Sequence, residues 1–209
     1  FVKRILDEKG EELLKKNNPE PREIAALFHR YDFDTHTKTE ILKEYTKLSG
    51  FSDAWVSVRS SVSAMLYPEV SFSGVFSTEL NIRGFNNLLK SIKDVYASFF
   101  RDSAVVYAVR EGVELADVKL AVVVQKMVHA EISGTCFTLD PVTLNVDRMN
   151  IEAVYGLGDV IANGEITPDS YSLHKKNLEV YEKHISPQEW MRVRALGNAS
   201  GGFEKINIS

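Results

Sequence analysis

The chain has 209 residues but a single cysteine, Cys136, and it lacks several features that would direct it to particular surroundings. One thiol cannot form an intrachain disulfide or a cysteine-built zinc site, and an unpaired thiol suits a reducing compartment. No apolar run approaches the ~20 residues of a membrane span, and Phe1-Val-Lys-Arg4 does not begin a signal peptide. The net charge of −4 lacks the basic excess typical of nucleic-acid binding. We therefore expect a cytoplasmic protein without nucleic-acid or membrane partners.

Standard catalytic motifs are also missing. The sequence contains neither a Gly-x-Ser-x-Gly nucleophile elbow nor a Gly-x-x-x-x-Gly-Lys-Ser/Thr phosphate loop. The histidines are scattered and have no i, i+4 partner of the kind found in metal sites. We therefore expect no metal site within this chain, and the histidines are His29, His36, His129, His174 and His184.

The first fifty residues have the periodicity of helices. Apolar residues from Phe1 to Leu14 lie at helical spacings, and Asn17-Asn-Pro19 breaks this pattern. Pro21 suits the first turn of a second helix. A third helix is predicted to begin with Thr35 or Thr37 as its cap and to end at Gly50.

A change of period after Gly50 introduces both strands and helices. Trp55 to Val58 is β-prone, whereas residues 62–84 lack regular periodicity and predict a functional loop. A broad apolar stripe over residues 85–100 predicts a helix, and a further helix is expected over residues 104–113.

The remainder of the sequence favours strands. We predict a buried strand over residues 118–128, strands over 133–140 and 150–155, and a pair of strands between Tyr171 and Tyr181. Ser186-Pro-Gln-Glu189 has the form of a capping box and predicts a short helix through Met191 and Leu196. The predicted class is α+β, with N-terminal helices followed by a mainly antiparallel sheet with flanking helices.

The most suggestive chemistry lies at the end of the first predicted strand. Val56-Ser-Val-Arg-Ser-Ser61 delivers Arg59 and two hydroxyls to the start of a long loop that contains Gly74. An arginine presents a planar set of donors that matches phosphate oxygens, and glycine lets backbone N–H groups approach a ligand closely. A polyphosphate site is one interpretation, and an arginine that caps the strand and pairs with a carboxylate is the other.

Several blocks together resemble the phosphoenolpyruvate synthase family, which includes pyruvate phosphate dikinase and rifampin phosphotransferase. The blocks occur in the family's order, they span residues 56–171, and each alone is a weak signal. They are Val56-Ser-Val-Arg-Ser-Ser61, Ser71-Phe-Ser-Gly74, Leu80-Asn-Ile-Arg-Gly84, Tyr96-Ala-Ser-Phe-Phe100, Leu120 to Val128, Ser133 to Pro141, Tyr155-Gly-Leu-Gly158 and Ile166 to Tyr171.

This resemblance implies an ATP-grasp nucleotide-binding domain that passes phosphate from ATP to a histidine on a separate phosphohistidine domain. It implies that Arg59 contacts the ATP phosphates and acts in catalysis, and that Gly74 and Thr78 lie in a loop over them. Gln125 would then lie beside the adenine, with the backbone near Met127 reading the purine edge. Asp140 and Asp159 remain open as supporting residues or as ordinary loop carboxylates.

Other features depart from the family pattern. Met65-Leu66 stands where the family has an acidic pair. The family's Gly-Gly-Lys-Gly loop, its magnesium carboxylates and its phosphohistidine motif are not found in the sequence. We therefore expect Mg²⁺ ligands to lie outside this chain. The prediction is a helical lead-in over residues 1–50 and a nucleotide-binding core over 51–209, incomplete at both ends and inactive alone.

The acceptor and the activity stay open at this point. A parent enzyme that makes phosphoenolpyruvate from pyruvate is the leading hypothesis. The alternatives are a rifampin- or glucan-directed dikinase of the same family, and a divergent, non-catalytic module for nucleotide binding or interaction.

Overall fold

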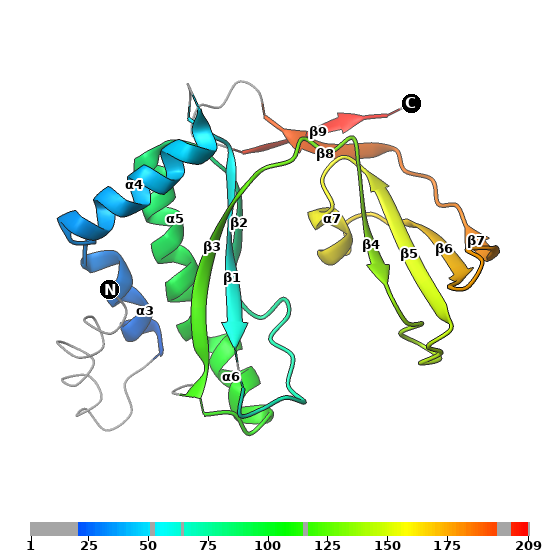
Figure 1. Cartoon of the computed structure of the whole chain (residues 1–209), viewed down its shortest axis with the longest axis horizontal. Coiled ribbons are helices and arrows are strands. Elements are labelled where there is room, and N and C mark those ends of the chain that lie inside the picture. Colours follow the sequence, from blue (N-terminus) through cyan, green and yellow to red (C-terminus); the bar gives the residue numbers. More distant parts are fainter. Residues whose placement is uncertain (1–20, 51–52, 64, 115–116, 196–201, 209) are drawn as a thin grey trace. The chain divides into compact units, whose positions relative to one another are not determined.

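The computed structural model describes residues 21–50, 53–63, 65–114, 117–195 and 202–208, which form two compact units (Figure 1). Unit 1 comprises the described residues up to Met127, and unit 2 comprises those from Val128 onward. The predicted class is confirmed, because helices come first and all sheets are antiparallel. The helix and break predicted over residues 1–19 lie outside the described residues. No described helix has the length and apolarity needed to cross a membrane.

The sheet of unit 1 has the strand order β2-β1-β3, so β1 is its central strand. The strands are β1 (Val56–Ser63), β2 (Thr78–Ile82) and β3 (Lys119–Lys126), and both pairings are antiparallel. The predicted loop over residues 62–84 was wrong in part, because it contains β2 and the end of β1. A five-residue edge strand is too short to give a clear period-two signal.

Helix α5 (Phe85–Ala97) lies along this sheet and supplies the core of unit 1 (Figure 1). Leu88 and Val95 are completely buried against Val56 and Val58 of β1. Each such side chain contributes about 1.5–3 kcal/mol of burial free energy. The predicted helices are therefore confirmed here, with a short 3-10 helix η2 (Ser98–Phe100) and α6 (Asp102–Arg110) following α5.

Two further helices, α3 (Pro21–Arg30) and α4 (Thr35–Ser49), precede the sheet. Asp34 caps α4 by accepting a hydrogen bond from the Thr37 N–H at 2.8 Å, so the predicted threonine caps were wrong. A carboxylate at this position satisfies a free amide and also favours the positive end of the helix dipole. Gly50 ends α4 as predicted, with a φ of +66°.

Burial of β3 differs from the prediction. The strand was expected to be fully buried, but its residues alternate between the core and an open face. Val122 and Val124 pack against the core, whereas Val123 is 44% exposed and Gln125 is also exposed. The continuous apolar run predicts a strand that is buried on both of its faces, but helices cover only one face of this sheet.

Unit 2 is built on a second antiparallel sheet of four strands in the order β4-β5-β6-β7. Val154, Val160 and Ile166 form its buried cluster. The strands predicted here are confirmed, and a short helix, α7 (Asp159–Ala162), lies between β5 and β6. The strands are β4 (Ile132–Phe137), β5 (Arg148–Tyr155), β6 (Asp169–His174) and β7 (Val180–His184).

The helix predicted from the capping box was wrong, because this segment forms β8 (Trp190–Arg194), paired with β9 (Phe203–Asn207). Ser186 donates its hydroxyl hydrogen to the Pro168 carbonyl at 3.1 Å instead of capping a helix. Gln188 bonds through its side chain to the Tyr155 N–H and the Ala153 carbonyl. Tertiary hydrogen bonds thus replace the local ones that the motif would make.

The turn after β5 explains the glycines of the Tyr155-Gly-Leu-Gly158 block. Gly156 has a φ of +75°, and a Cβ there would lie 2.3 Å from the Arg192 carbonyl oxygen. Gly156 N–H donates to the Glu131 carbonyl at 2.7 Å, and Leu157 N–H donates to that of Arg192 at 2.9 Å. This close backbone approach joins β8 to the main sheet of unit 2 and admits only glycine.

We predict that Gly156→Ala lowers the free energy of unfolding of unit 2 by about 3 kcal/mol, because it adds a backbone clash to an unfavourable φ. Gly164→Ala is the matched control, since its φ is +67° but a Cβ there would meet no atom within 4 Å. The control should cost only about 1 kcal/mol. Amide hydrogen exchange of β4–β7 measures both values, and equal effects would contradict the clash.

Candidate functional site

A pocket of about 530 Å³ opens in unit 1 where β1 and β2 meet the loop between them. It brings together three of the five residues predicted for the site, namely Arg59, Gly74 and Thr78. The remaining lining combines hydroxyl groups with apolar and aromatic side chains: Ser60, Val62, Tyr67, Pro68, Val70, Ser71, Phe72, Ser73 and Phe76.

Arg59 and Thr78 face each other across the β1–β2 pairing. Thr78 therefore belongs to a strand and not to a loop, which corrects the prediction of its setting. The antiparallel register fixes the two side chains on one face of the sheet, independently of the loop.

The guanidinium of Arg59 has one hydrogen bond within the described chain, from Nε to the Ser57 hydroxyl oxygen at 3.2 Å. Ser57 in turn donates to the Gln125 carbonyl at 3.4 Å. Among the described residues, no carboxylate lies within ion-pair distance of Arg59. The ion pair that would make Arg59 a structural residue is thus not found among the described residues, and the terminal nitrogens of its exposed side chain have no hydrogen-bond partner there.

Gly74 lies at the tip of the loop, with a φ of +75° and open space where a Cβ would stand. Its conformation, not crowding, thus favours glycine at this position. The loop turns tightly on either side of Gly74, because Ser73 N–H donates to the Ser71 hydroxyl oxygen at 3.3 Å and Val75 N–H to the Phe72 carbonyl at 3.2 Å.

An aromatic cluster holds this loop against the helices. Phe72 and Phe76 stack at 5.6 Å between ring centroids, and Phe76 stacks on Phe99 of η2 at 5.2 Å. Tyr107 of α6 meets the edge of Phe72 and donates its hydroxyl hydrogen to the Ser71 carbonyl at 2.6 Å. A loop without regular secondary structure is thereby fixed at both its side chains and its backbone.

Gln125 and Met127 lie apart from this pocket, further along β3. Gln125 pairs with Ser57 and shares the exposed sheet face with Arg59. Met127 follows the strand, and its N–H donates to the Trp55 carbonyl at 2.8 Å. Since Val123 is opposite Arg59, the two residues lie about 7 and 13 Å along the strand from that point.

Sequence reasoning missed three residues of this region: Ser57, Tyr67 and Ser73. Ser57 is 1% exposed and orients Arg59, and the period of two along β1 could have identified it, since it lies two residues before Arg59. Tyr67 and Ser73 line the pocket from an irregular loop, where no periodic signal exists.

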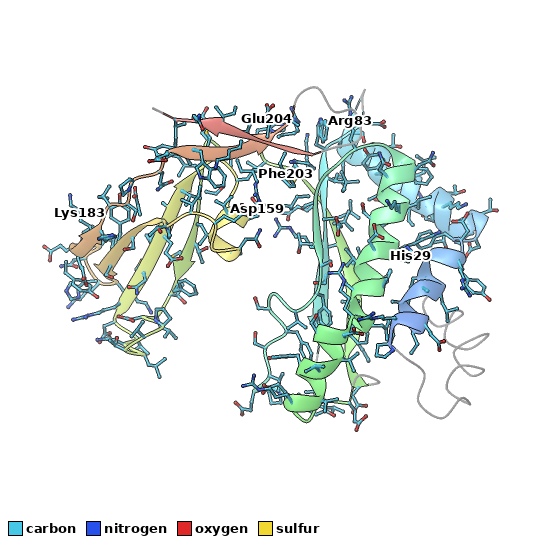
Figure 2. All side chains as sticks on the ribbon, turned by 180° about the vertical axis from the view of Figure 1, so that it is seen from behind. His29, Arg83, Asp159, Lys183, Phe203 and Glu204 are labelled. Carbon is cyan, nitrogen blue, oxygen red and sulfur yellow. The ribbon has the colours of Figure 1, made fainter. Side chains whose placement is uncertain are left out.

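The two acidic residues left open by the sequence have local structural partners in unit 2. Asp140 accepts hydrogen bonds from the Val142 and Thr143 N–H groups, and these bonds, that of Thr143 foremost, hold the pKa of Asp140 below its ordinary value. Asp159 pairs with Arg192 at 2.6 Å (Asp159 is labelled in Figure 2). Asp140 therefore organises its loop, and Asp159 ties α7 to β8.

Metal ligands are not gathered within the part of the chain that the structure describes. No group of three or more His, Cys, Asp or Glu side chains there could hold an ion. The described residues thus do not fit a resident metal, and the pocket of unit 1 depends on Arg59, hydroxyl groups and backbone amides.

Within the part of the chain that the structure describes, the pocket thus combines an arginine that has no carboxylate partner there with hydroxyl groups and a glycine turn. Comparison identifies the family. Residues 2–207 match the family described as pyruvate phosphate dikinase, AMP/ATP-binding domain, and the chain belongs to this family. The resemblance stated from the sequence blocks is confirmed, and with it a nucleotide-binding domain that takes AMP or ATP.

Three relatives illustrate this membership. The chain is 38% identical over 176 residues to a probable phosphoenolpyruvate synthase of Methanocaldococcus jannaschii, covering 83% of this chain and 15% of that protein. It is 36% identical over 174 residues to phosphoenolpyruvate synthase of Pyrococcus furiosus, covering 82% and 21%. It is 39% identical over 163 residues to rifampicin phosphotransferase of Bacillus cereus, covering 78% and 18%. The chain thus spans only about a fifth of the length of these relatives.

We predict that Tyr107→Phe loosens the pocket loop without unfolding unit 1, because it removes one hydrogen bond and keeps the ring packing. The loss is about 0.5–1.5 kcal/mol of local opening free energy. Hydrogen exchange of the amides between Tyr67 and Ser77 measures it, with Tyr31→Phe, directly after α3, as the control. Two outcomes would contradict this role of Tyr107: faster exchange throughout unit 1, or an exchange rate in the loop that does not increase.

Proposed function

We propose that this chain is the ATP-binding portion, of ATP-grasp type, of a dikinase-type phosphotransferase. In this proposal the intact enzyme phosphorylates a histidine on a separate domain and ultimately makes phosphoenolpyruvate from pyruvate. The observation that carries the proposal is the position of Arg59, which lines a pocket with Gly74 and Thr78 and has no carboxylate partner among the described residues.

The phosphate end of the nucleotide is proposed to occupy this pocket. The Arg59 guanidinium offers two terminal nitrogens to phosphate oxygens, and the Thr78 hydroxyl lies on the opposite strand. The turn adds the N–H of Gly74, where no Cβ obstructs an approaching ligand, whereas the Ser73 and Val75 N–H groups bond within the loop. Such donors hold a polyanion by local charge and hydrogen bonding, so the chain's net charge of −4 does not oppose binding.

The adenine end is proposed to lie toward Gln125 and Met127. Gln125 shares the open sheet face with Arg59, and the strand leads directly from one site to the other. A nucleoside triphosphate extended along β3 would place its base at the end of the strand, where backbone groups near Met127 read the purine edge. The exposed Gln125 amide is available to the ligand without the cost of burying an unpaired polar group.

Arg59 is also proposed to act in the transfer step. Negative charge spreads over the equatorial oxygens of a phosphoryl group as it is transferred, and a fixed cation that contacts them lowers the barrier. We expect Mg²⁺ to participate through ligands beyond the described residues, since these residues hold no metal-ligand cluster. No step is assigned to the ion, and this chain is expected to show little turnover alone.

The acceptor is the least determined part of the proposal. Identity to the phosphoenolpyruvate synthase of P. furiosus (36%) and to the rifampicin phosphotransferase of B. cereus (39%) is similar. A nucleotide-binding domain shared by both kinds of relative does not select between pyruvate, an antibiotic or a glucan. Pyruvate remains the leading proposal, and a rifampin- or glucan-directed enzyme is the alternative within the family.

A non-catalytic module for nucleotide binding or interaction is the second candidate function. Its support is the pair Met65-Leu66, whose side chains are 84% and 71% exposed just before the pocket loop. Exposed apolar residues at a turn favour contact with another surface over chemistry. Retained ATP binding without phosphorylation of a histidine domain in a full-length protein would favour this candidate.

We predict that Arg59→Ala weakens ATP binding by about 1.5–3 kcal/mol, roughly ten- to a hundredfold, because it removes charge-assisted hydrogen bonds to phosphate. Adenosine binding should change little, since the base and ribose lie away from Arg59. Calorimetric titration of this chain, and of a longer form that carries the remaining domains of the family, measures both affinities.

Arg110→Ala is the control for this experiment, because Arg110 lies in unit 1 with its side chain 82% exposed and outside the pocket. It removes the same charge and should leave ATP affinity nearly unchanged. Equal losses in the two variants would indicate a nonspecific charge effect. An unchanged ATP affinity in Arg59→Ala would remove Arg59 from the site.

A further inference from the structure

A second pocket of unit 1 lies between helices α3, α4 and α5, away from the open sheet face. It has a volume of about 260 Å³ and lies among side chains that are mostly cationic or donors of hydrogen bonds. Figure 2 labels His29, which stands on α3 where this helix runs beside α5. The polar lining is His29, Asp32, Lys38, Asn86, Lys90 and Lys93.

Positive charge exceeds negative charge in this lining. Lys38, Lys90 and Lys93 contribute three ammonium groups, whereas Asp32 contributes one carboxylate, which leaves an excess of two positive charges. Asp94, which lies 3.6 Å from His29, is a further carboxylate near the pocket but is not part of its lining. Lys38 stands on α4 and the other two lysines on α5, and a concave site with like charges on two sides attracts an anion.

The lysines are held toward the pocket by their surroundings. Lys93 has only 14% of its side chain exposed, lies 3.2 Å from Asp32 and stands over the Phe33 ring at 5.6 Å. Lys38 bonds to the other oxygen of Asp32. Each ammonium group carries three hydrogens, so one bond to Asp32 leaves donors available for a second acceptor.

Lys90 differs from the other two, because it forms no ion pair with any residue that the structure describes. It lies one turn after Asn86 and nearly one turn before Lys93, on the same side of α5. The first turn of α5 contains no acidic residue, and its cap residue Gly84 has no side chain to accept a hydrogen bond. The Asp53 carboxylate lies close to Gly84 and opposes the positive end of the helix dipole, so the positive charge of the pocket comes from the lysines.

We propose that the pocket between α3, α4 and α5 is a second anion site, which binds a phosphate dianion or the phosphate of a small phosphomonoester through Lys38, Lys90 and Lys93. Asn86 supplies a neutral amide donor at its edge. The site is independent of the proposed nucleotide pocket, because the two share no lining residue.

A purely structural ion-pair network is the competing explanation, and Asp32 separates the two. The hydrogen bond from Lys38 and that from Lys93 hold the pKa of Asp32 at about 2, so the carboxylate is charged near neutral pH and competes with an incoming anion for the same ammonium groups. If the lysines serve only Asp32, the unaltered chain shows no saturable phosphate binding, because the carboxylate already occupies their donors. If they form an anion site, neutralising Asp32 strengthens binding.

The test is a titration of the ¹⁵N-labelled chain with inorganic phosphate and with glycerol 3-phosphate, at constant ionic strength made up with sodium chloride. We expect saturable shifts of the Asn86, Lys90 and Lys93 amides with both probes. Saturation by inorganic phosphate alone would restrict the site to the free ion. Shifts that do not saturate, or that chloride produces equally, would overturn the proposal.

Lys90→Gln should reduce phosphate affinity about three- to tenfold, because it removes one charged donor and breaks no internal ion pair. Lys43→Gln on α4 is the matched control, since it removes the same charge outside the pocket, and it should leave affinity unchanged. An equal loss of phosphate affinity in the two variants would overturn the proposal, because it would indicate a nonspecific effect of the chain's charge.

Asp32→Asn should raise phosphate affinity several-fold, and the asparagine oxygen can still accept the bond that the Phe33 N–H now makes to Asp32. An affinity that stays the same or falls in a folded variant would favour the structural network. Should this variant not fold, Lys90→Gln and Lys43→Gln remain decisive. Arg59→Ala should leave phosphate binding here unchanged, so this test can fail independently of the proposed nucleotide site.

Discussion

Unit 1 depends on β1, the central strand, which pairs with both β2 and β3. The alternation of side chains along β1 decides which residues enter the core and which lie on the open face. Val56 and Val58 are completely buried against α5, so the residues between and after them must point to the opposite, open face. Ser57 and Arg59 occupy that face for this reason. A slip of one residue in the register would bury the arginine and expose the valines, so the core itself fixes the direction of Arg59.

The pocket loop shows a different kind of constraint, in which packing substitutes for backbone hydrogen bonding. The segment between β1 and β2 has few ladder bonds, yet Phe72 and Phe76 anchor it in an aromatic cluster with Phe99. Among the loop residues that the structure describes, only Gly74 at the tip has a left-handed conformation. The loop therefore combines a fixed base with a tip free of side chains, an arrangement that brings backbone amides close to a ligand without requiring the whole loop to move.

Prediction from the sequence succeeded where a single period continued over many residues, as in α5, and where apolar runs were bounded by turn residues, as in β5. It failed at Ser186-Pro-Gln-Glu189, because the Gln188 side chain bonds to the edge of β5 and not to its own backbone. It overstated the burial of β3, since composition does not reveal how many sheet faces are covered. The chemistry of Arg59 was enough to predict it as a site residue, and that prediction stands as a proposal, whereas its orientation by Ser57 required the register of the strands.

Two arginines of the chain show why partners, more than residue type, distinguish structural from functional roles. Arg192 pairs with two carboxylates, Asp159 and Glu165, at its two terminal nitrogens, and its carbonyl accepts the Leu157 N–H. An additional anion there would be repelled by the two carboxylates. Arg59 has a single neutral partner among the described residues and lines a pocket, so its exposed guanidinium keeps donors that no carboxylate there occupies. That imbalance is the physical reason to expect an anionic ligand at Arg59 and none at Arg192.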